Sequence, residues 1–151
     1  MEVTKQDLIN SHNRIKPFIH DTPVLTSNYV NEITGAEVYF KCENFQKMGA
    51  FKMRGAANAI LKLTDEQKNN GVVTHSSGNH AQAISLAAKK IGIKAYIVMP
   101  SNAPKIKKEA VKGYGGELIE CESNLEAREA AAKDLVDSKS ATFIHPSNNL
   151  D

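Results

Sequence analysis

The chain has 151 residues, of which 19 are Lys or Arg and 17 are Asp or Glu, so its formal net charge at pH 7 is +2. With 41% hydrophobic and 24% charged residues, the composition is that of a soluble globular protein and excludes an intrinsically disordered one. Its longest apolar stretch, Tyr96–Met99, is far shorter than the roughly 20 residues of a transmembrane helix. The near-neutral charge gives no reason to expect nucleic acid or a membrane as a partner, and we expect a cytoplasmic protein.

The N-terminal third is expected to contain short helices and strands. Thr4 followed by Asp7 is a helix-start pattern, and Glu37–Cys42 alternates as a strand does. The predicted segments are a helix over 4–15, a strand over 24–26, a helix between Ser27 and Gly35, a strand over 37–42 and a helix over 52–63. The polar stretch 64–70 is a candidate domain boundary, and within it Asp65–Gln67 resembles a helix first turn after Thr64.

Strands and helices alternate regularly after Gly71. The predicted segments are a strand over 72–75, a helix over 81–90, a strand over 93–99, a helix over 104–113, a strand over 117–120, a helix over 124–136 and a strand over 142–145. Short connections between them favour a parallel sheet built from right-handed βαβ units, so the fold class is α/β.

Ligands of open parallel sheets bind beyond the carboxyl ends of the strands. The richest such turn is His75–His80, whose small hydroxyls, glycine and amide suit a carboxylate or a phosphate. The alternative is that its Ser and Asn side chains only cap the helix that begins near Ala81.

Lys52 follows a Gly-Ala-Phe turn and opens a predicted helix, where the helix dipole disfavours a positive charge. An amine that must be neutral to attack a carbonyl benefits from such a place. The alternative is a solvated lysine in a first turn. Only two cysteines occur, Cys42 and Cys121, which indicates a reducing compartment and not a disulfide framework. Neither has a partner at metal-ligand spacing, so no metal site is expected in this chain.

Three motifs occur together in one order. They are Lys41-x-Glu43-Asn44-x-Gln46, then Gly49-Ala50-Phe51-Lys52-x-Arg54-Gly55-Ala56, then Ser76-Ser77-Gly78-Asn79-His80-Ala81-Gln82. Together they resemble the pyridoxal-phosphate enzymes of fold type II, and within them the branch of serine racemase, threonine/serine dehydratase and hydroxyaspartate dehydratase. The resemblance covers essentially the whole chain. It implies that residues 1–68 begin the large, cofactor-binding domain, that 69–146 form the small α/β domain with a three-layer parallel sheet, and that 147–151 return to the large domain.

The resemblance also implies roles for individual residues. Lys52 would form the Schiff base with pyridoxal phosphate, Phe51 would pack beside the cofactor, and Asn79 would hydrogen-bond its ring hydroxyl. The substrate carboxylate would be held by Ser76, Ser77, Asn79, His80 and Arg128. Ser77 would also return a proton to the face opposite Lys52. An ATP-type nucleotide effector would lie near Lys47, Gln82 and Tyr114.

Arg128 and the lysines near Pro104 can also be explained without a ligand. Arg128 could instead pair with a glutamate on an exposed helix. The lysines of the helix near Pro104 suggest a phosphate patch, but a solvated helix face is the favoured interpretation. They are Lys105, Lys107, Lys108 and Lys112.

The implied activity is a dehydratase or racemase acting on serine, threonine or 3-hydroxyaspartate. Family members continue with a glycine-rich phosphate loop and, in several, a Mg²⁺ site, neither of which lies in this chain. We therefore expect a truncated form of an enzyme whose full-length protein is a homodimer, with apolar surface exposed by the truncation. The alternative is a non-catalytic α/β folding or interaction module.

Overall fold

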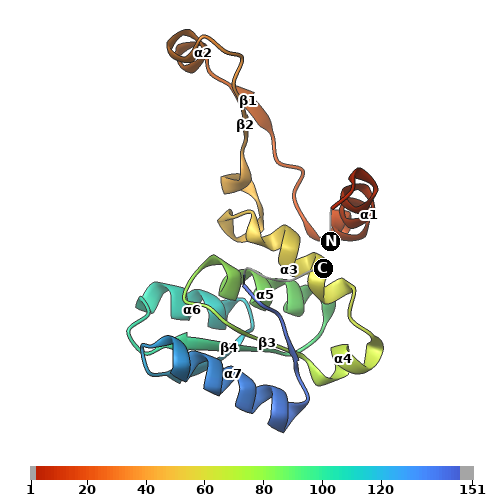
Figure 1. Cartoon of the computed structure of the whole chain (residues 1–151), viewed down its shortest axis with the longest axis vertical. Coiled ribbons are helices and arrows are strands. Elements are labelled where there is room, and N and C mark those ends of the chain that lie inside the picture. Colours follow the sequence, from red (N-terminus) through yellow and green to blue (C-terminus); the bar gives the residue numbers. More distant parts are fainter. Residues whose placement is uncertain (1–2, 147–151) are drawn as a thin grey trace.

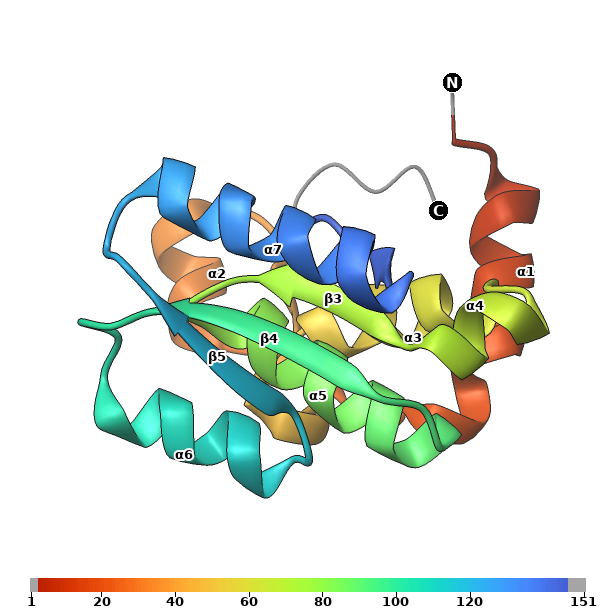
Figure 2. The same ribbon diagram turned by 90° about the horizontal axis from the view of Figure 1, so that it is seen from below.

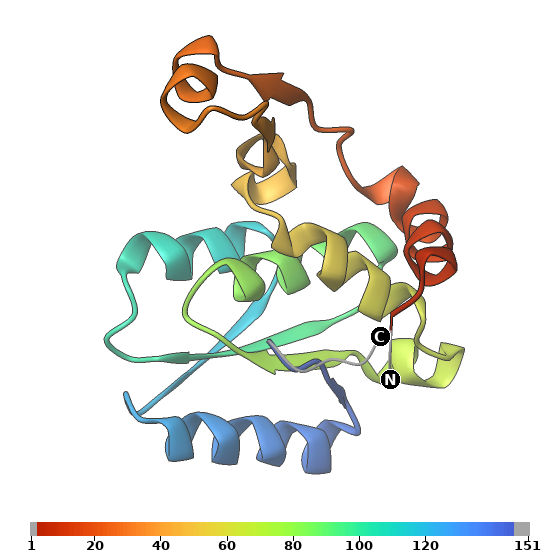
Figure 3. The same cartoon turned by 45° about the horizontal axis from the view of Figure 1, so that its top comes forward.

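The computed structural model describes residues 3–146. Four parallel strands form one sheet in the order β5-β4-β3-β6. They are β3 (Val72–His75), β4 (Ala95–Pro100), β5 (Glu117–Cys121) and β6 (Thr142–Phe143). Helices α3 (Lys52–Leu61), α5 (Asn79–Ile91) and α6 (Lys105–Gly113) lie on one face of this sheet, and α7 (Leu125–Lys139) crosses the other (Figures 2 and 3). The predicted three-layer α/β architecture is confirmed.

The N-terminal elements lie outside this sheet. They are α1 (Lys5–Ile15), a 3₁₀ turn (Lys16–Phe18), β1 (Val24–Thr26), α2 (Asn28–Thr34), β2 (Tyr39–Lys41) and two further 3₁₀ turns, Glu43–Phe45 and Lys47–Gly49. Strands β1 and β2 pair antiparallel, with Leu25 opposite Phe40. Together with α2 they form an arm that extends away from the sheet (Figure 1).

Most helix starts follow from the capping residues that the sequence offers. Thr4 and Asp7 form a capping box at α1, Ser27 caps α2, and Asn124 caps α7. The polar stretch 64–70 is the helix α4 (Asp65–Asn70), which opens with a capping box of Thr64 and Gln67. That stretch is therefore regular structure rather than an open linker.

Two apolar clusters cover the two faces of the sheet, because alternate residues of a strand point to opposite sides. The larger cluster packs β4 against α3 and α5, and its fully buried side chains include Met53, Ile60, Ile84, Ile97 and Met99. The smaller one packs the sheet against α7 through Val73, Tyr96, Val98, Ala132 and Ala141. The sheet and its helices thus form the stable body that carries the loops at the strand ends.

The arm leaves large apolar side chains in solvent. The most exposed of these are Tyr29 at 72%, Ile33 at 67% and Tyr39 at 63%. Leu25 and Phe40 are also exposed. Apolar surface is therefore exposed in this part of the chain, whereas truncation as its cause stays a prediction.

Candidate active site

The turn after β3 leads directly into α5. The N–H of Ser76 donates to the carbonyl of Val98 in the neighbouring strand, at 3.1 Å. Gly78 is the N-cap of α5, and no side chain caps this helix. The interpretation that Ser and Asn only cap a helix near Ala81 is therefore wrong, since the helix already begins at Asn79.

Several donors of this turn are free to hold a ligand. The first N–H groups of a helix have no acceptor within the helix. Within residues 3–146, the hydroxyl of Ser77 and the amide of Asn79 have no hydrogen-bond partner. The Ser76 hydroxyl accepts from the N–H of Gly78 at 3.3 Å. Such a cluster of donors at a helix start suits a carboxylate.

His80 is held in one orientation beneath the turn. Its ring is buried, and Nε2 lies 3.4 Å from the carbonyl oxygen of Ile144. Burial lowers the pKa of His80 to about 4, so the ring is neutral at pH 7. The same carbonyl accepts from the hydroxyl of Thr74 at 2.8 Å. The segment after β6 thus fixes the start of α5.

Lys52 contacts the same segment. Its Nζ donates to the carbonyl oxygen of Pro146 at 2.7 Å and lies 5.5 Å from the centre of the Phe51 ring. The side chain is half-buried, whereas Phe51 is exposed. The Lys52 ammonium is therefore held by the protein and not by solvent alone, and the charge of Lys52 contributes to the lowered pKa of His80.

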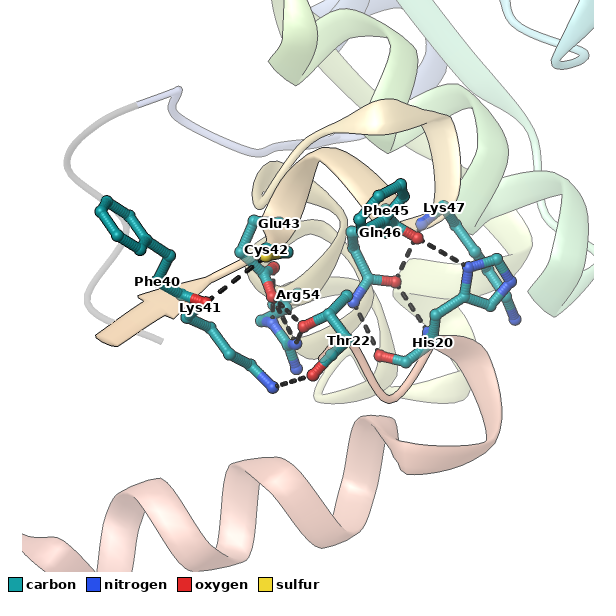
Figure 4. Close-up of polar contacts among 10 residues, drawn as sticks. All are labelled: His20, Thr22, Phe40, Lys41, Cys42, Glu43, Phe45, Gln46, Lys47 and Arg54. Carbon is teal, nitrogen blue, oxygen red and sulfur yellow. Dashed lines mark hydrogen bonds and ion pairs between the residues drawn. The ribbon is translucent and has the colours of Figure 1, made fainter. Parts of the chain in front are cut away.

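A polar cluster anchors the chain on both sides of Lys52 (Figure 4). Arg54 donates from Nε and Nη2 to the two carboxylate oxygens of Glu43, at 2.8 Å and 2.7 Å. Thr22 donates to Glu43 at 2.6 Å, and Lys41 donates to the carbonyl of Thr22 at 2.6 Å. The hydrogen bonds from Arg54 hold the pKa of Glu43 at about 2.

Gln46 extends this anchoring to the chain after α1. Its buried amide accepts from the N–H of His20 at 2.7 Å and donates to the carbonyl of His20 at 2.9 Å. The motif residues Glu43, Gln46 and Arg54 therefore tie three chain segments together around Lys52. Sequence reasoning named them as a motif but assigned them no role, although acid, amide and guanidinium so near a candidate lysine were the available signal.

Within residues 3–146, no hydrogen bond joins Arg128 to the turn. Its Nε donates to the carbonyl of Asn124 at 3.2 Å, and it forms no ion pair within the described part of the chain. Burial, and next the charge of Arg128, lower the pKa of His75, whereas the charge of Glu129 raises it. The alternative that Arg128 forms an ion pair with a glutamate is therefore not supported within the described residues.

A cavity of about 400 Å³ lies between α7 and strands β3 and β6. His75, Phe143 and His145 line it together with the apolar side chains Ala132 and Val136. It belongs to the α7 face of the sheet, whereas Lys52 opens α3 on the other face. We therefore place the candidate site at Lys52 and the turn after β3.

The residues expected around a nucleotide lie on three elements. Lys47 is in a 3₁₀ turn, Gln82 is in α5, and Tyr114 is the C-cap of α6. Burial lowers the pKa of Lys47, and the charge of Lys90 lowers it further. No hydrogen bond joins these side chains among residues 3–146, and the effector site stays a prediction.

Between residues 3 and 146, no group of at least three His, Cys, Asp or Glu side chains is placed to hold a metal ion. The helices of that range are also too short or too polar to span a bilayer.

A family model described as "Pyridoxal-phosphate dependent enzyme" matches residues 15–151. The serine racemase of Dictyostelium discoideum is 52% identical over 148 residues, which are 98% of this chain and 46% of that protein. The beta-hydroxyaspartate dehydratase of Paracoccus denitrificans is 49% identical over 146 residues, which are 97% of this chain and 46% of that protein. The chain thus spans less than half the length of these relatives.

Solved structures agree with this comparison. The crystal structure of the Dictyostelium discoideum serine racemase superposes with a TM-score of 0.94 at 52% identity, over 98% of this chain and 48% of that chain. The crystal structure of a T.th. threonine deaminase gives a TM-score of 0.88 at 36% identity, over 98% of this chain and 46% of that chain.

Proposed function

Since this chain belongs to the pyridoxal-phosphate dependent enzyme family, we propose that it forms the lysine-bearing part of an amino-acid racemase or dehydratase. One observation carries the proposal. Lys52 donates to the Pro146 carbonyl, and His80 meets the Ile144 carbonyl of the same segment. The Lys52 amine and the first turn of α5 are therefore both held by the segment that follows β6.

The residues present fit the aldehyde end of pyridoxal phosphate. The Lys52 amine has a carbonyl as its acceptor, the Phe51 ring beside it is exposed, and the Asn79 amide is free of partners within residues 3–146. When bound, this cofactor supplies an aldehyde for the amine and an electron sink for the substrate. Lys52 would bind it, Phe51 would pack against it, and Asn79 would hydrogen-bond its ring.

The other residues act on the amino acid. The N–H groups at the start of α5 and the hydroxyls of Ser76 and Ser77 would bind its carboxylate. His80, being neutral, can accept or donate a hydrogen bond there without adding charge. Arg128 of α7, whose charge acts on His75 at the end of β3, would also bind the carboxylate.

Proton transfer then decides the product. The free amine of Lys52 would remove the α-proton from one face. If the Ser77 hydroxyl gives a proton to the opposite face, the α-centre inverts and the reaction is a racemisation. If a β-hydroxyl leaves first as water, hydrolysis of the product gives a keto acid and ammonia. The names of the relatives support serine and hydroxyaspartate as substrates, and a solved threonine deaminase supports threonine.

The whole protein would complete this site. The proposal includes a cytoplasmic homodimer that takes small amino acids, with an ATP effector near Lys47, Gln82 and Tyr114 and with Mg²⁺ bound outside this chain. A second candidate function is a non-catalytic interaction module. The exposed apolar side chains of the arm favour it, because such surface is typical of a docking site.

Cofactor labelling tests the proposal. The chain is mixed with pyridoxal phosphate, reduced with borohydride and digested, and the modified lysine is identified by mass spectrometry. We expect labelling at Lys52, its loss in Lys52→Ala, and no change in Lys112→Ala, which removes an exposed lysine. Diffuse labelling of surface lysines would contradict the proposal and support the non-catalytic module.

A further inference from the structure

One lysine of α6 lies beside the turn that would bind the carboxylate. A Cβ atom placed on Gly78 would be 3.8 Å from Nζ of Lys107. Helices α5 and α6 lie side by side on one face of the sheet (Figure 2), so α6 can present a side chain to the start of α5. The Lys107 ammonium therefore lies next to the middle residue of the turn.

Among the residues that the structure describes, Lys107 differs from its neighbours Lys105 and Lys108 in having no counter-ion. Lys105 pairs with Glu109 at 3.7 Å, and Lys108 pairs with Glu120 at 2.6 Å. Lys107 is half-buried, and within residues 3–146 its ammonium has neither a hydrogen bond nor an ion pair. The interpretation of these lysines as one solvated helix face thus does not describe Lys107. An unpaired cation beside free donors is suited to an anionic ligand.

Charged side chains act on both histidines that flank the turn. The charge of Lys52 lowers the pKa of His80, and the charges of Arg128 and Glu129 shift the pKa of His75 in opposite directions. In the proposed function Lys52 is occupied by the cofactor, which leaves Lys107 as the cation placed beside Gly78. A second carboxylate on the bound amino acid would give Lys107 the acceptor that it lacks within residues 3–146.

We propose that Lys107 is a specificity-determining residue that binds the second carboxylate of a dicarboxylic amino acid of the 3-hydroxyaspartate type. This inference rests on the proposed function, since it takes the turn after β3 as the site of the first carboxylate. Serine and threonine have no second carboxylate for Lys107. One additional partly screened ion pair corresponds to about a five-fold preference for the dicarboxylate.

The test is a pair of titrations, without cofactor, of the 151-residue chain carrying Lys52→Ala, which removes the cation that the cofactor would otherwise occupy. L-threo-3-hydroxyaspartate and L-serine are added separately, and amide shifts of Gly78 and Asn79 in ¹⁵N NMR spectra give the two dissociation constants. Lys107→Met removes the charge and keeps the stem, whereas Lys107→Arg keeps the charge. Lys105→Met is the matched control, because Lys105 is an exposed lysine of the same helix.

We expect the Lys52→Ala chain, alone and with Lys107→Arg or Lys105→Met, to bind hydroxyaspartate about five-fold more tightly than serine, and Lys107→Met in the same background to lose this preference. A preference that survives in Lys107→Met, an equal weakening of both ligands, or the absence of hydroxyaspartate-dependent shifts at Gly78 would overturn the proposal. Borohydride labelling of Lys52 tests the proposed function separately. If Lys52 is labelled but hydroxyaspartate is not preferred, the proposed function stands and the role of Lys107 is refuted. If hydroxyaspartate is preferred but Lys52 is not labelled, the role of Lys107 stands and the proposed function is refuted.

Discussion

The guanidinium of Arg54 holds the carboxylate of Glu43 through two hydrogen bonds that span the turn carrying Lys52. Both side chains are largely shielded, with 28% and 20% of their surfaces exposed. This pair therefore acts on the position of Lys52, although neither side chain forms a hydrogen bond with Lys52 itself in the described part of the chain.

Replacing Arg54 by lysine should lower the free energy of unfolding by about 1.5–3 kcal/mol, because one ammonium cannot make both hydrogen bonds. Urea unfolding followed by circular dichroism measures the change. Glu32→Gln on the exposed arm is the control and should stay within about 0.5 kcal/mol of the wild type. An unchanged midpoint in Arg54→Lys would mean that this pair does not stabilise the fold.

Glu43 should make stability fall in acid. Its pKa is about 2 in the folded chain against an ordinary value of 4.5, so the unfolded chain binds the proton more readily. The contribution is complete above pH 4.5 and is lost as the pH falls toward 2, amounting to about 3 kcal/mol at most. Unfolding curves across this range measure it, and Glu43→Gln should flatten them. A slope that persists in that variant would assign the effect to other carboxylates.

His80 should act in a higher pH range. Its pKa is lowered from 6.5 to about 4 by burial, so protonation favours the unfolded chain. The contribution of His80 to the free energy of unfolding is therefore constant above pH 6.5 and declines as the pH falls toward 4. Ring ¹⁵N shifts should show a neutral imidazole at pH 6, and His80→Gln should remove this part of the pH dependence. A charged ring at pH 6 would contradict the assignment.

Gly116 is placed where no side chain fits. A Cβ there would overlap Oγ of Ser85 and lie 3.0 Å from both Ile97 and Val111. Gly116→Ala should cost about 1–3 kcal/mol in unfolding free energy, since α5, α6 and β4 meet at this point. Gly113→Ala is the control, because nothing lies within 4 Å of its Cβ position, and thermal unfolding compares the two. Equal melting temperatures would show that the packing around Gly116 is loose.

The apolar arm should cause self-association. Leu25 and Phe40 form a cross-strand pair and are 51% and 44% exposed. Sedimentation velocity should show oligomers whose share grows with concentration, and Leu25→Ser with Phe40→Ser should reduce them. Glu32→Ser, a change at a charged residue of the same arm, should leave them unchanged. A wild-type chain that remains a monomer at all concentrations would refute this expectation.

The sequence predicts those parts of the fold that depend on neighbouring residues. Thr4, Ser27 and Asn124 cap the helices that their positions indicate, because a capping hydrogen bond spans only three residues. The start of α5 is less predictable. Local preference favours Ser or Asn as the cap, yet Gly78 occupies that position and leaves the donors of the turn free.

Contacts between distant segments account for what sequence reasoning did not find. The carbonyl of Pro146 carries no sequence signal as an acceptor for Lys52, and the position of Lys107 over Gly78 depends on how α6 packs against α5. The resemblance identified Lys52 and the turn as a pair. The pairing of β3 with β6 explains how Lys52 and the turn are both held by residues 144–146.

The short strand β6 also has a consequence for synthesis of the chain. Lys52 and His80 leave the ribosome well before the segment that supplies their acceptors, since Pro146 follows Lys52 by 94 positions. A nascent chain that ends before Thr142 can form the helices but has neither carbonyl in place. The amine therefore gains its contact with the Pro146 carbonyl only after β6 has been made, and a shorter nascent chain lacks the contacts of both Lys52 and His80 with this segment.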